Sequence, residues 1–159
     1  QAIREACTQF VATRTTEGEH LKQDLVEKLH HMRDNVDKVE QRAPQIIAEY
    51  RSKLMEKVNE LLGDTQIDEA RLSTEIVLFA DKICTDEEVV RLKSHIAHMK
   101  ETFATEENGI GRKLDFIAQE MNREANTILS KANDIEVSNY AIDLKTEIEK
   151  VREQIQNIE

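Results

Sequence analysis

The sequence predicts an all-α protein in which long antiparallel helices form an elongated helical bundle with coiled-coil-like seams. Apolar residues recur three and four positions apart along most of the 159-residue chain, which is the spacing of one helix face. Residues that break helices are rare, with one Pro and four Gly. Charged residues make up 34% and aromatic residues 4%, a balance typical of long helices, so we expect no conventional sheet.

The first predicted unit, residues 1–63, contains a long helix, a break and a second helix. Apolar or small residues at positions 7, 11, 18, 21, 25, 29, 32, 36, 39 and 43 form the seam of the long helix. We expect Pro44 to end it, because a proline ring disfavours the helical conformation in the preceding residue and suits the first turn of a new helix. The second helix would end at a Gly63 cap. Its inward residues would be Ile47, Tyr50, Leu54, Val58 and Leu61.

The second predicted unit, residues 64–159, contains four more helices. The first spans residues 67–83, and a capping box at residues 85–88 begins the next. A loop at residues 108–111 and a break near residues 133–134 delimit the remaining two. The heptad seam of the helix after residue 85 consists of Val89, Leu92, Ile96, Met99 and Phe103. The seam of the last helix consists of Val137, Ala141, Leu144, Ile148, Val151, Ile155 and Ile158.

Residues 111–132 sort their polar side chains around a helix in a way that solubility does not require. One apolar stripe consists of Leu114, Ile117, Ala118, Met121, Ala125, Ile128, Leu129 and Ala132. On one side of it lie Asp115, Gln119, Asn122, Asn126 and Asn133, and on the other lie Lys113, Glu120, Glu124, Thr127 and Lys131. Amides are mediocre helix formers that each offer a donor and an acceptor. Spacing alone favours interhelical hydrogen bonds somewhat over a binding surface.

Charge, cysteines and hydropathy limit the possible functions. The net charge of −10 repels nucleic acid unless the basic residues are clustered, metal ions bridge the phosphates, or a partner supplies a positive field. Cys7 and Cys84 are far apart and have apolar neighbours, which predicts buried free thiols and a reducing compartment. No signal peptide or membrane-spanning run is recognised, so we expect a cytoplasmic protein. The chain starts inside a helical pattern, which suggests a fragment.

Several polar groups are candidates for chemistry, each with a structural alternative. Gly18 interrupts the first seam close to Arg14, and either a kink or the close approach of a backbone or ligand would explain it. Glu87, Arg91 and His95 form an i, i+4, i+8 ladder, which is more often an exposed salt-bridged face. No Walker A loop, dinucleotide fingerprint, HExxH, zinc finger or nucleophile elbow is present, so those enzyme classes are disfavoured.

Five blocks of sequence are distinctive: RTTEG near the start, EARLSTEIVLFADK, EEVVRLKSH, GRKLDFIAQEMNREANTILSKA and the closing LKTEIEKVREQIQNIE. Together they resemble the C-terminal half of the YicC/YloC family of bacterial proteins. The resemblance implies a cytoplasmic endoribonuclease that requires a divalent metal, Mn²⁺ or Mg²⁺, and cleaves single-stranded RNA. It also implies a homo-oligomer, a hexamer in full-length members, with neither a membrane nor DNA as a partner.

For residues that match the family motifs, we assign physical roles as hypotheses. Phosphodiester hydrolysis needs a polarised phosphate, an activated nucleophile and charge neutralisation. The metal ligands would be Glu88, Glu120 and Glu124, and together with His95 as the proton-transfer group they form the expected catalytic set. The expected RNA-binding residues are Arg14, Arg91, Lys113, Arg123 and Lys131 for phosphates, and Asp115, Gln119 and Asn126 for bases, sugars or neighbouring side chains.

Two other functions are compatible with the sequence. In the first, the chain is a non-catalytic helical oligomerisation or interaction module of a larger RNA-processing protein. In the second, which has weaker support, it is an adaptor whose acidic surface recruits a basic protein.

Overall fold

The computed structural model describes residues 1–62, 68–105, 109–156 and 158, which form helices and no strand. The helices are α1 (Ala2–Leu62), α2 (Glu69–Ile83), α3 (Asp86–Thr105), α4 (Gly111–Lys131) and α5 (Ile135–Ile155). Among the described helices none combines the length and the apolar character needed to cross a membrane. The predicted all-α class is confirmed.

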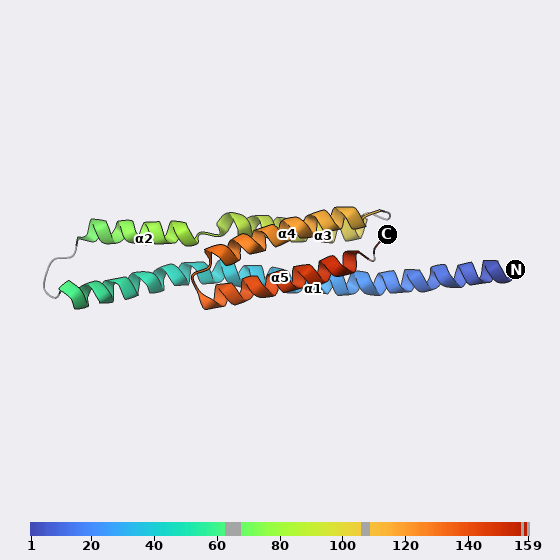
Figure 1. Ribbon diagram of the computed structural model, residues 1–159, viewed down its shortest axis with the longest axis horizontal. Coiled ribbons are helices and arrows are strands. Elements are labelled where there is room, and N and C mark those ends of the chain that lie inside the picture. The colour runs from blue at the N-terminus through green and yellow to red at the C-terminus, as the bar shows by residue number, and fades with distance from the viewer. Residues whose placement is uncertain (63–67, 106–108, 157, 159) are drawn as a thin grey trace.

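Four of the helices form an elongated antiparallel bundle. α1 packs against α3 and α5, and α4 packs against both α3 and α5 on the other side (Figure 1). α2 packs on the distal part of α1, so that these two helices form an arm beyond the bundle (Figure 1). At the opposite end, the first part of α1 projects alone past the C-terminus (Figure 1).

The seams predicted for α3, α4 and α5 form the core. α3 begins at Asp86, directly after buried Thr85, as the capping signal predicts. α5 begins after Asp134, whose carboxylate accepts hydrogen bonds from the amides of residues 136 and 137, so the predicted break is confirmed. The buried core residues of these helices are Val89, Leu92, Ile96, Met99, Phe103, Leu114, Ile117, Ala118, Met121, Ala125, Ile128, Val137, Ala141, Leu144, Ile148, Val151 and Ile155.

The predicted break at Pro44 is wrong, because α1 continues through it. A proline inside a helix removes one hydrogen bond and destabilises the helix by about 3 kcal/mol. Arg42 offsets this locally by bridging the proline: its guanidinium donates to Gln45 at 3.3 Å and to Glu49 at 2.6 Å. It also donates to Asp134 at 2.8 Å, which ties the same turn of α1 to the start of α5.

Other expectations for the first unit are also corrected. The seam of α1 is buried from Leu25 to Val39, but every residue of 1–20 is exposed because no described helix packs beside that part. Cys7 and Cys84 are free thiols, as expected, but both are exposed, not buried. Leu61 was expected to face inward and is 76% exposed. The expected Gly63 cap lies outside the described residues.

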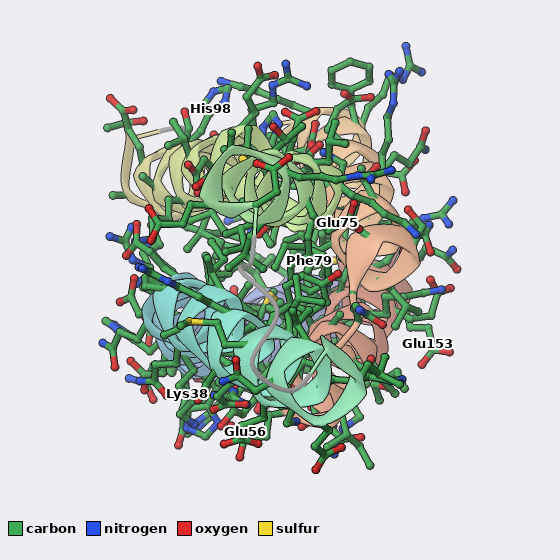
Figure 2. The ribbon with its side chains drawn as sticks, turned by 90° about the vertical axis from the view of Figure 1, so that its left-hand side faces the viewer. Lys38, Glu56, Glu75, Phe79, His98 and Glu153 are labelled. Atoms are coloured by element: carbon green, nitrogen blue, oxygen red, sulfur yellow. The ribbon has the colours of Figure 1, made fainter. Side chains whose placement is uncertain are left out.

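The arm is held by a smaller contact than the bundle. The rings of Tyr50 and Phe79 are stacked with centroids 3.7 Å apart, and Tyr50 donates a hydrogen bond to Glu75. Viewed from this end, Phe79 lies toward the middle of the molecule, whereas charged residues such as Glu56 and Glu153 lie at its rim (Figure 2). The bundle therefore supplies most of the buried apolar surface.

Candidate functional site

α4 buries one face in the bundle and leaves the opposite face in solvent. The predicted apolar stripe is buried from Leu114 to Ile128, and Leu129 and Ala132 are partly buried at its end. The residues at the centre of the open face are all exposed, and we call this set the α4 ridge: Arg112, Phe116, Gln119, Arg123 and Asn126. A shallow hollow beside its second half is lined by α4 alone and encloses no ligand; its residues are Gln119, Asn122, Arg123, Asn126, Thr127 and Ser130.

The amide side of α4 has both structural contacts and open groups. Asp115 accepts a hydrogen bond from Arg152 of α5 at 2.9 Å and another from Gln119 at 2.7 Å. Asp115 thus helps to fix α4 against α5, and Gln119 contacts Asp115 from within α4. Asn126 is exposed, so part of the row remains available to a ligand. Both interpretations of the row, as interhelical contacts and as a binding surface, are therefore compatible with the geometry.

The charged side of α4 faces α3, and Lys131 occupies its end. The ammonium of Lys131 donates to the Glu88 carboxylate at 2.8 Å and to the backbone carbonyl of Cys84 at 3.0 Å. Glu88 is only 7% exposed. Its burial alone would raise the pKa of the carboxyl, but the Lys131 hydrogen bond, a backbone hydrogen bond and the nearby Arg91 charge together lower the pKa below its ordinary value.

One turn further along this interface, Arg91 pairs with two carboxylates. Its guanidinium lies 2.8 Å from Glu87, which confirms the first step of the predicted ladder, and 3.7 Å from buried Glu124 on α4. His95 on α3 and Glu120 on α4, each one turn from these residues, are half-buried. Two of the predicted catalytic residues, Glu88 and Glu124, thus take part in ion pairs across the α3–α4 interface.

The predicted metal ligands do not form a recognisable metal cluster. Within residues 1–62, 68–105, 109–156 and 158, no three His, Cys, Asp or Glu side chains are grouped to hold a metal ion. One buried oxygen of Glu88, Oε2, has no hydrogen-bond partner in this part of the chain, but the other oxygen is bound to Lys131. Glu124 likewise faces Arg91. Basic side chains thus already contact two of the predicted ligands, Glu88 and Glu124, and the described residues supply no preformed three-ligand site for a divalent cation.

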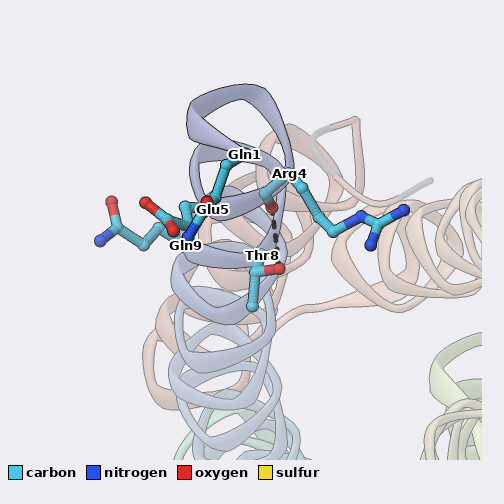
Figure 3. Close-up of a pocket in the computed structure, with 5 residues that line it drawn as sticks. All are labelled: Gln1, Arg4, Glu5, Thr8 and Gln9. Atoms are coloured by element: carbon cyan, nitrogen blue, oxygen red, sulfur yellow. Dashed lines mark hydrogen bonds between the residues drawn. The ribbon is translucent and has the colours of Figure 1, made fainter.

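Arg14 belongs to the exposed residues 2–20 of α1, apart from the other predicted residues. Its guanidinium lies 5.8 Å from the centroid of the Phe10 ring. A hollow near the end of this segment is lined by α1 alone, and its only drawn hydrogen bond joins the Thr8 hydroxyl to the Arg4 carbonyl (Figure 3). A hollow built from a single exposed helix does not enclose a ligand, so we assign it no site.

The sequence interpretation missed two members of the ridge, Phe116 and Arg112. Phe116 is 64% exposed. The sequence alone could have predicted this exposure, since residue 116 lies opposite the predicted apolar stripe on a helical wheel. The sequence also shows that α4 is net positive. It contains four basic and three acidic residues, whereas α1, α2, α3 and α5 each contain more acidic than basic residues.

Together, the fold and the ridge define a helical protein in which the one net-positive helix among those described turns an open face to solvent, a surface that suits an extended polyanion. Residues 39–159 match the family model described as endoribonuclease YicC-like, C-terminal. The chain belongs to this family.

Two curated relatives extend the match to the whole chain. One, from Clostridioides difficile (strain 630), is called a probable endoribonuclease YicC and is 42% identical over 160 residues, which cover 100% of this chain and 54% of the relative. The other, from Haemophilus influenzae, carries the same name and is 36% identical over 99% of this chain and 54% of its own length. The chain therefore spans about half the length of the curated relatives it matches.

Proposed function

We propose that the full-length protein is a cytoplasmic endoribonuclease that cleaves single-stranded RNA, and that this chain contributes the surface along which the strand lies. The observation that carries the proposal is the α4 ridge, which is open to solvent on the one described helix with a positive balance of charge. In a chain of net charge −10, local clustering of basic residues is what lets a polyanion approach. The names of the two relatives support the reaction class.

The chain's own residues would act by binding and orienting the strand. Arg112 and Arg123 extend from the ridge, while Arg91 and Lys131 border it on the α3 side. Glu87 and Glu124 already orient Arg91, and Glu88 already orients Lys131. These two basic side chains therefore lose less conformational entropy when they bind a phosphate. His95 would serve as the proton-transfer group, since an imidazole can both accept and donate a proton.

Dependence on Mn²⁺ or Mg²⁺ and assembly into hexamers are parts of this proposal that rest on the family resemblance. A bound divalent ion would polarise the scissile phosphate. The described carboxylates supply no three-residue site for it, so we route no step through Glu88, Glu120 or Glu124.

The test compares the full-length protein with Arg123→Gln and Arg112→Gln variants on a labelled unstructured RNA. Each ridge substitution should weaken binding and reduce the slope of log affinity against log salt by about 0.7, the value for one phosphate contact with a single strand. The matched control is Arg51→Gln, an exposed arginine on the distal part of α1, which should leave both quantities unchanged. Failure of the wild-type protein to bind or cleave single-stranded RNA would refute the proposed function.

One observation favours the alternative role as an assembly module. The outer face of α2 exposes Val77 and Leu78, at 66% and 60%, and the projecting part of α1 exposes Phe10 and Val11, both at 62%. Sedimentation of the 159-residue chain would test this role. A stable oligomer without RNA binding would favour it over the enzyme proposal.

A further inference from the structure

Phe116 is exposed in a setting that differs from that of the other aromatic rings. Phe103 is buried in the core, and Tyr50 and Phe79 stack on each other. The ring of Tyr140 lies 5.5 Å from the Lys38 ammonium and that of Phe10 lies 5.8 Å from the Arg14 guanidinium. Among the described residues, no ring or cation is stacked on Phe116.

The position of Phe116 matters more than its exposure, because single exposed apolar residues are common on protein surfaces. It lies at the centre of the α4 ridge, opposite the buried stripe. Arg112 precedes it by one helical turn and Arg123 follows it by about two turns, so basic groups lie on either side of the ring along the helix. Gln119, one turn away, adds an amide donor and acceptor.

This arrangement has the two components that proteins use to hold single-stranded nucleic acid. Basic side chains follow the sugar-phosphate backbone, and an aromatic face stacks on a base. Duplex RNA does not offer such a base, because its bases are already paired and stacked. A ridge with one exposed ring between arginines therefore favours an unpaired strand over a duplex.

We propose that the Phe116 ring is a stacking site for a nucleobase of the bound strand, with phosphates on either side contacted by Arg112 and Arg123. This inference rests on the proposed function and adds a base contact to it. One ring stacks on purines and pyrimidines alike, so the site supplies affinity and a preference for unpaired RNA, with little selection among bases.

The first experiment measures RNA affinity of the full-length protein in EDTA, using normal oligoribonucleotides and a strand that is abasic at its central positions. Phe116→Ala should weaken binding of the normal strand at least about fivefold, which is the lower limit for loss of one stacked base. It should leave binding of the abasic strand unchanged. Phe116→Tyr and Phe116→Trp should restore most of the affinity, whereas Phe116→Leu should not, because leucine keeps the apolar surface without the ring.

The matched control is Met55→Ala, which removes an exposed apolar side chain, 38% exposed, from the distal part of α1. It should leave RNA affinity unchanged. Phe116 could instead contact a second copy of the chain, and sedimentation of Phe116→Ala tests this alternative. Loss of assembly, together with an equal loss of affinity for the normal and the abasic strand, would overturn the stacking site. Equal affinity of wild type and Phe116→Ala for the normal strand would overturn it as well, and the proposed function would stand.

A spectroscopic experiment is independent of those affinities. This chain contains no tryptophan, so Phe116→Trp in the 159-residue protein places a single indole at the proposed site. Stacking of a base should quench its fluorescence when the normal strand binds, and the abasic strand should quench it much less. Binding detected by anisotropy without a change in indole emission would contradict the inference.

Discussion

Replacing Pro44 by Ala tests whether α1 is one continuous helix. Pro44 is exposed and has α1 on both sides of it, from Ala2 to Leu62. Alanine at this position adds no atom that could clash, and it supplies the backbone N–H that proline lacks. That N–H would donate to the carbonyl of Glu40, four residues earlier.

The expected magnitude follows from two opposing effects. Proline in a helix interior is about 3 kcal/mol less favourable than alanine. Proline also restricts the unfolded chain, which is worth about 0.4–1 kcal/mol in the other direction. We therefore expect Pro44→Ala to raise the free energy of unfolding by about 2 kcal/mol, somewhat less if Arg42 already holds the two turns together.

Equilibrium unfolding in urea, followed by circular dichroism, measures this difference. The midpoint should rise with an unchanged slope, because the surface exposed on unfolding stays the same. Ala48→Pro, one turn later on the exposed side of α1, is the control and should destabilise the protein by about 3 kcal/mol. An unchanged or lower midpoint for Pro44→Ala would mean that the chain does not continue as a regular helix at this position.

Three further predictions concern packing and charge. Gly111→Ala should lower the midpoint, because a Cβ there would lie 2.6 Å from the backbone carbonyl oxygen of Ile158. Glu88→Gln should lower the stability of the protein at pH 7. The difference in stability between wild type and variant should shrink as the pH falls below about 4.5 and vanish below the lowered pKa of Glu88, because a protonated Glu88 no longer pairs with Lys131. Unfolding midpoints of both proteins from pH 7 to pH 3 measure this difference. Arg42→Met should lower the thermal midpoint, since it removes the contacts between α1 and the start of α5.

Controls for these variants come from similar residues with fewer contacts. Gly18→Ala should increase local helix content, because no atom lies within 4 Å of the added Cβ. If it lowers RNA affinity instead, a ligand or partner approaches Gly18 closely. Arg33→Met removes an exposed i, i+4 pair with Asp37 and should change the midpoint less than Arg42→Met does. A larger effect for Arg33 would contradict the role given to Arg42.

The bundle could be predicted from sequence because its seams are periodic over short distances. Val89, Leu92 and Ile96 show the same three- and four-residue spacing that the buried face of α3 requires. Pro44 misled the prediction because a local rule describes an isolated helix, whereas contacts with distant parts of the chain decide the outcome here. The exposure of Cys7 has a similar origin: a seam predicts burial only where another helix lies beside it.

The site could be predicted only in part. The residues of the α4 ridge follow from one helix, so the wheel already placed Gln119 and Asn126 away from the core. The pairing of Lys131 with Glu88 depends on the register between α3 and α4, which periodicity within either helix does not specify. The contact between Arg42 and Asp134 spans 92 residues and was missed for the same reason.

The projecting start of α1 transmits force directly to the core. Residues 2–20 extend about 30 Å at 1.5 Å per residue, and they continue without a joint into the turns that carry Leu25 and Leu29. A rigid rod with one embedded end acts as a lever, so a load applied near Arg14 becomes a torque on the packed side chains. A partner that grips the outer turns is therefore connected to the bundle by continuous helix.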